Sequence, residues 1–133
     1  MPERQFEDSV VRADRWSKAV ALVVAIGVFL LSVRLTADQQ FGSIVAATVA
    51  IGTRLYIPYH ASMSVPEPDR IPIHAHPDTG SYHHGAVGGA LAIAPFASLA
   101  VMTVHPAFLP AIGAGVVVGV VVYWVLYAVL PTE

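Results

Sequence analysis

Three long stretches without a charged side chain constrain the fold more than any other feature of this sequence. Residues 19–33, 39–53 and 79–132 contain no Asp, Glu, Lys or Arg. A helix needs about 20 apolar residues to cross a hydrocarbon core about 30 Å thick. With 56% hydrophobic and 12% charged residues in a chain of 133, a soluble globule would leave much of this apolar surface in water. The sequence therefore predicts an all-α integral membrane protein.

Polar and proline-containing breaks divide the chain into four expected spans within a single transmembrane domain, residues 1–133. We place the spans at about residues 16–35, 41–57, 85–104 and 111–130 from their hydropathy and length. A short turn joins the first span to the second, and another joins the third to the fourth. Short connections favour antiparallel neighbours, so the pattern predicts a four-helix bundle made of two helical hairpins. A re-entrant half-span is the alternative for the short second segment.

Individual residues mark where several of these helices begin, bend or end. Asp38 is placed to cap the start of the second helix, and Pro110 suits the first turn of the fourth. Pro58 is expected to end the second helix, because proline has no amide hydrogen to donate. Pro95 lies in the middle of the third span and frees the carbonyl of Leu91, so we expect a kink there.

Lys and Arg side chains predict the orientation of the four spans. An even number of spans places both termini and the polar loop at residues 58–84 on the same side of the membrane. Six of the seven basic residues fall on that side, and Arg34 alone falls on the other. The positive-inside rule then places the termini and the loop in the cytoplasm. The six residues are Arg4, Arg12, Arg15, Lys18, Arg54 and Arg70.

Small residues recur at four-residue spacing in three of the expected spans. Because lipid removes the hydrophobic drive for helix association, close backbone contact at small residues supplies much of the stabilisation. These positions are therefore the predicted contacts, within the bundle or between protomers. The alternative is that Gly and Ala are simply common in apolar helices. The predicted packing residues are Gly42, Ala46, Gly85, Gly89, Gly115 and Gly119.

The sequence disfavours several classes of function. Without cysteine there are no disulfides, thiolate metal sites or cysteine nucleophiles, and a net charge of −2 offers no basic surface for nucleic acid. No Asp, Glu, Lys or His lies near the middle of a span. Proton relays, voltage sensors and ion-coupled transporters use such intramembrane groups, and retinal binding needs a buried lysine. We therefore expect none of these activities.

The loop at residues 58–84 holds five of the six histidines and is the main candidate for chemistry. A turn is expected around Asp78, whose carboxylate can bond to the backbone two residues on. A hairpin closed by that turn would place His74, His76 and His83 on one face. Imidazoles so placed can hold a divalent ion such as Zn²⁺. The predicted metal ligands are His74, His76, His83, His84 and Asp78.

Other interpretations of the loop stay open. It can be a polar segment that docks a partner subunit or lipid phosphates, or a pH-responsive or catalytic segment, since imidazoles titrate close to neutral pH. No H-E-x-x-H motif or nucleophile elbow accompanies the histidines. We therefore expect a non-enzymatic structural or accessory component of a larger membrane assembly, embedded in the lipid bilayer as a homo-oligomer or with other membrane subunits. The alternative is a metal-dependent membrane protein, either an enzyme or an ion-handling protein, built on the histidine loop.

Overall fold

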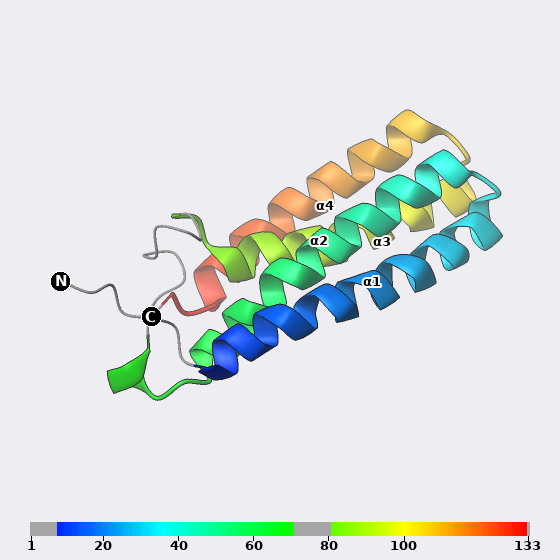
Figure 1. The fold of residues 1–133 in the computed structure, drawn as a ribbon. Coiled ribbons are helices and arrows are strands. Elements are labelled where there is room, and N and C mark those ends of the chain that lie inside the picture. The colour runs from blue at the N-terminus through cyan, green and yellow to red at the C-terminus, as the bar shows by residue number, and fades with distance from the viewer. Residues whose placement is uncertain (1–7, 71–80, 133) are drawn as a thin grey trace.

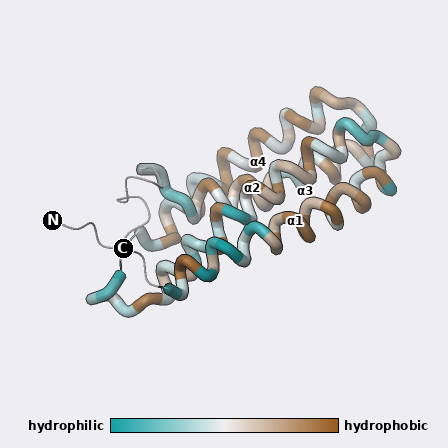
Figure 2. The backbone as a smooth tube through the Cα atoms, in the orientation of Figure 1, coloured by the Kyte–Doolittle hydropathy of each residue, from teal (hydrophilic) through white to brown (hydrophobic). Residues whose placement is uncertain are grey.

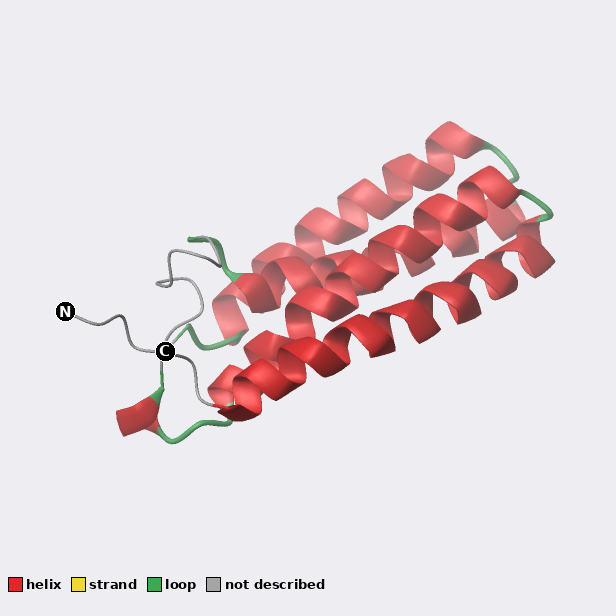
Figure 3. Ribbon diagram, in the orientation of Figure 1, coloured by secondary structure: helices red, strands yellow, loops and turns green. Residues whose placement is uncertain are grey.

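The computed structural model describes residues 8–70 and 81–132, and it is all-helical there (Figures 1 and 3). Four helices are each long and apolar enough to cross a membrane, which confirms the all-α class and the number of helices. Figure 2 shows hydrophilic residues gathered towards the helix ends, mainly where α1 begins and α2 ends. The elements are α1 (Asp8–Thr36), α2 (Gln39–Met63), the short 3-10 helix η1 (Glu67–Asp69), α3 (His84–Val104) and α4 (Phe108–Val129).

Helices that follow one another in the sequence pack against one another in space. α1 packs along α2, α2 along α3, and α3 along α4, whereas α1 and α3 touch only slightly. The first turn of α1, the last turn of α4 and the described parts of the α2–α3 connection lie at one end of the molecule (Figure 1). Among the described residues, α4 packs mainly against α3, so α2 and α4 flank α3 without forming an extensive interface of their own.

The tight turn between α1 and α2 is fixed by local hydrogen bonds. The Asp38 carboxylate accepts a hydrogen bond from the Phe41 amide at 2.9 Å, which confirms the predicted cap of α2. The preceding residue, Ala37, has a left-handed φ of 56°. The Ala37 amide still bonds to the Val33 carbonyl at 2.8 Å, and the left-handed conformation of Ala37 then turns the chain away from the helix axis and ends α1.

The prediction that α2 ends at Pro58 is wrong, because the helix continues to Met63. Proline removes one amide donor, which costs the bond to the carbonyl of Arg54 but leaves the other helical bonds intact. The end of α2 is held instead by the guanidinium of Arg70, which donates to the carbonyls of Met63 at 2.9 Å and Val65 at 3.1 and 2.9 Å. A cation is favourable at a helix C-terminus, where unpaired carbonyls gather.

The helices also begin before the expected span boundaries, α1 by the largest margin. α1 starts at Asp8, before the first apolar run, and its polar early turns carry an exposed Asp14–Lys18 ion pair at 3.9 Å. α4 starts at Phe108, which places Pro110 in its first turn as predicted. Pro95 is buried within α3, at the position where a kink is expected.

Candidate functional site

Only part of the predicted metal site lies among the residues that the structure describes. His74, His76 and Asp78 lie outside those residues, whereas His83 and His84 lie within them. Residues 8–70 and 81–132 contain no group of three or more His, Cys, Asp or Glu side chains that could hold a metal ion. The two described histidines are therefore the part of this prediction that can be placed.

His83 caps the start of α3 and reaches the end of α4. Its Nδ1 accepts a hydrogen bond from the Ala86 amide at 3.2 Å. Because Nδ1 is the acceptor, the proton of the neutral ring lies on Nε2, which is 3.2 Å from the carbonyl oxygen of Leu130 and donates to it. Both ring nitrogens of His83 therefore already form hydrogen bonds. Metal ligation through His83 would break one of these two bonds.

The neighbouring His84 is also buried, at 7% exposure, in the first turn of α3. Its ring stacks on the exposed ring of Tyr82, with centroids 4.1 Å apart and planes inclined by 22°. The structure therefore places the two histidines in different surroundings. His83 faces the ends of α2 and α4, and His84 packs against the segment that leads into α3.

Tyr59 of α2 completes a contact between three helices, which we call the aromatic clamp (Tyr59, His83 and Tyr127). The Tyr59 hydroxyl donates to the carbonyl of Pro131, immediately after α4. The His83 ring lies between the other two rings, 5.5 Å from Tyr59 and 5.6 Å from Tyr127 between centroids. The clamp thus ties the chain after α4 to α2 and α3. The sequence places these tyrosines near the helix ends but contains no spacing signal for the clamp.

The residues predicted for helix packing all lie at or near helix contacts. A Cβ on Gly42 would lie 3.0 Å from Val33 Cγ2 of α1, and one on Gly119 would lie 3.2 Å from Ala94 Cβ of α3. A Cβ on Gly85 would collide with the ring of Tyr59. The three others are Ala46, which is buried in α2, Gly89, which faces Leu126, and Gly115, which faces Ser98.

A close approach of two backbones involves glycines that the four-residue spacing did not identify. A Cβ on Gly52 would collide with the Ala92 amide and lie 2.6 Å from the Gly88 carbonyl oxygen. A Cβ on Gly88 would lie 2.8 Å from the Tyr56 amide nitrogen. α2 and α3 therefore meet backbone to backbone at this pair. A signal was present in the run of glycines at 85, 88 and 89, which share one helical face.

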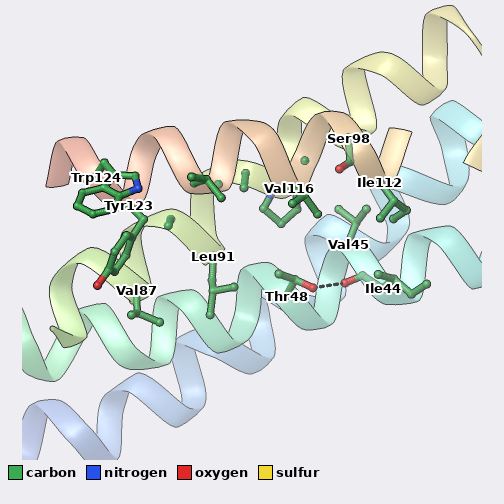
Figure 4. Close-up of a pocket in the computed structure, with 16 residues that line it drawn as sticks. Ile44, Val45, Thr48, Val87, Leu91, Ser98, Ile112, Val116, Tyr123 and Trp124 are labelled. Atoms are coloured by element: carbon green, nitrogen blue, oxygen red, sulfur yellow. Dashed lines mark hydrogen bonds between the residues drawn. The ribbon is translucent and has the colours of Figure 1, made fainter. Parts of the chain in front are cut away.

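A cavity of about 520 Å³ lies between α2, α3 and α4 (Figure 4), and we call it the side cavity. α3 forms its floor through residues that include Leu91 and Ser98, while α2 and α4 form its walls. Its lining is mostly aliphatic, and the hydroxyl of Thr48 is turned onto the carbonyl of Ile44 at 2.8 Å. Tyr123 and Trp124 lie together at one end of the cavity, far from Ser98 (Figure 4).

Comparison of the chain with protein-family models, with curated proteins and with solved structures gives no match.

Proposed function

We propose that this protein is a multi-pass membrane protein that acts as a non-enzymatic structural or accessory component of a larger membrane assembly. The four apolar helices and the hydrophilic residues at their ends support insertion in a bilayer. Helices packed through glycine, as at Gly52 and Gly88, are typical of association in lipid. The basic residues near the end where α1 begins support a cytoplasmic location for that end.

The exposed face of α4 is the observation that carries this proposal. α4 is apolar throughout, yet of its residues Ala111 and Gly115 are the buried ones. Its side that faces away from the rest of the protein is rich in valine, including the exposed Val117, Val121 and Val125. Branched side chains have few rotamers to lose, so packing a partner helix against them costs little conformational entropy. We therefore propose that assembly occurs through this face of α4.

Gly113 provides a test of assembly through α4. A Cβ at this exposed position would meet nothing within 4 Å, so the protomer can accept a larger side chain. Gly113→Leu is expected to stabilise α4 itself, because leucine forms helix better than glycine by roughly 1 kcal/mol. The same side chain would obstruct a helix docked against α4. We therefore expect Gly113→Leu to convert a large complex into protomers in native gel electrophoresis of membranes solubilised in mild detergent.

Gly27→Leu on α1 is the matched control, since Gly27 is also exposed with nothing within 4 Å of an added Cβ. The control should leave the large complex intact. Migration of the unmodified chain as an isolated 14.1 kDa protomer in its detergent micelle would contradict the proposal. So would a complex that is unchanged by Gly113→Leu.

A further inference from the structure

Serine and threonine hydroxyls in this protein mostly bond within their own helix. Thr48 donates to the Ile44 carbonyl and Thr53 to the Val49 carbonyl, each at 2.8 Å. This arrangement satisfies a hydroxyl without any partner from outside the helix. Among the helical residues that the structure describes, Ser32 and Ser98 are the buried serines that make no hydrogen bond; the Ser32 oxygen is completely enclosed, whereas the Ser98 oxygen is not.

These two serines differ in what can reach them. Ser32 is fully buried, and its Cβ lies 3.4 Å from the position of an added Cβ on Gly42, so it is enclosed between α1 and α2. Ser98 is 5% exposed and lines the side cavity. Its oxygen lies against α4, in the space that a Cβ on Gly115 would fill. Because Ser98 lines the cavity and its oxygen is not completely enclosed, a molecule in the cavity can approach the Ser98 hydroxyl.

The residues around Ser98 restrict the kind of ligand that can bind in the cavity beside it. Water is a poor occupant, because a buried water needs two to four polar partners and this part of the cavity is aliphatic. A ligand with its own N–H or O–H can form only one hydrogen bond with Ser98, so one of the two donors would stay unpaired in the aliphatic lining, at a cost of several kcal/mol. A carbonyl oxygen accepts the Ser98 proton and needs nothing in return. The cavity volume of about 520 Å³ also lies in the ordinary range of small-molecule sites.

We propose that the side cavity binds a lipid-soluble carbonyl compound. Its hydrocarbon body lies along the aliphatic walls of α2 and α4, and its carbonyl oxygen accepts a hydrogen bond from Ser98. Two sources share this chemistry: the ring carbonyl of a quinone with an alkyl tail, and the ester carbonyl of a fatty chain. Trp124, which lines the same cavity, reports on either occupant by fluorescence.

The test uses Trp16→Phe, which leaves Trp124 as the sole tryptophan of the chain. The protein in lipid nanodiscs is titrated with decylbenzoquinone and, separately, with a doxyl-labelled fatty acid methyl ester, both of which quench tryptophan. Saturable quenching by at least one probe is expected. Adding Ser98→Ala should weaken that affinity about 5- to 10-fold, the value of one net hydrogen bond.

Ser32→Ala is the matched control, because it removes the other unbonded hydroxyl at a place the cavity does not reach. It should leave the affinity unchanged. Saturation by the quinone alone identifies a ring carbonyl, and saturation by the ester alone identifies an acyl carbonyl. Both results support the site when Ser98→Ala weakens binding. Quenching that rises linearly with both probes, or an affinity that Ser98→Ala does not change, overturns the proposal.

Discussion

Gly52→Leu is expected to lower the free energy of unfolding by about 3 kcal/mol or more, the largest effect of any single substitution considered for this protein. An added Cβ at Gly52 would collide with the Ala92 amide and lie within 2.7 Å of both the Gly88 oxygen and the Leu91 carbonyl carbon. These atoms belong to the backbone of α3, so rotation of a side chain cannot relieve the overlap. α2 and α3 must separate, and the dispersion contacts along their interface are then lost.

The measurement is an equilibrium unfolding titration in mixed micelles, followed by far-ultraviolet circular dichroism. Gly27→Leu is the control, because the same side chain there meets nothing within 4 Å. Leucine favours helix over glycine by roughly 1 kcal/mol, so the control should be neutral or stabilising. Equal stability of Gly52→Leu and Gly27→Leu would show that α2 and α3 do not meet at Gly52.

His83→Ala is expected to cost about 2–4 kcal/mol through the loss of two separate hydrogen bonds. Removal of the acceptor for the Ala86 amide takes away the cap of α3, which is worth about 0.5–2 kcal/mol. Removal of the donor to Leu130 leaves a carbonyl without its partner, which costs about 1–3 kcal/mol for a buried group and falls towards the lower end of that range here because the pair is part-buried. The same unfolding titration measures the sum of the two losses.

Two variants separate the contributions of His83. His83→Asn retains a side-chain acceptor suited to a helix cap, so we expect it to recover about 1 kcal/mol relative to His83→Ala. His60→Ala is the control, because His60 is exposed and, within the part of the chain that the structure describes, its ring stacks on Tyr56. That change should stay within about 0.5 kcal/mol of the unmodified protein. Equal effects of His60→Ala and His83→Ala would contradict the arrangement of the aromatic clamp.

The features that the sequence predicted well are those set by neighbouring residues or by length. The charge-free runs determine the number of helices, because a helix that crosses hydrocarbon needs about 20 apolar residues whatever surrounds it. The cap by Asp38 depends on Phe41, three residues away. In both cases the deciding interaction lies within a single segment of the chain.

The features that the sequence did not predict depend on residues that are distant along the chain. α2 continues past Pro58, and Arg70 donates hydrogen bonds to the carbonyls at its end. The expectation that proline ends a helix takes no account of such a distant cation. The orientation of His83 is set by Leu130, 47 residues away. The contact of Gly52 with Gly88 depends on how two helices cross, which four-residue spacing within one helix does not determine.

Labelling of single cysteines tests most directly the central claim that the chain crosses a membrane four times with both ends on one side. The chain has no native cysteine, so each variant carries one reporter. In intact cells, a membrane-impermeant maleimide should label Gln40→Cys and His105→Cys, which lie in and beside the two short turns. Ser64→Cys and Thr132→Cys should react only after the membrane is permeabilised. Labelling of Thr132→Cys but not of Ser64→Cys in intact cells would contradict the account, as would a chain that stays soluble without detergent.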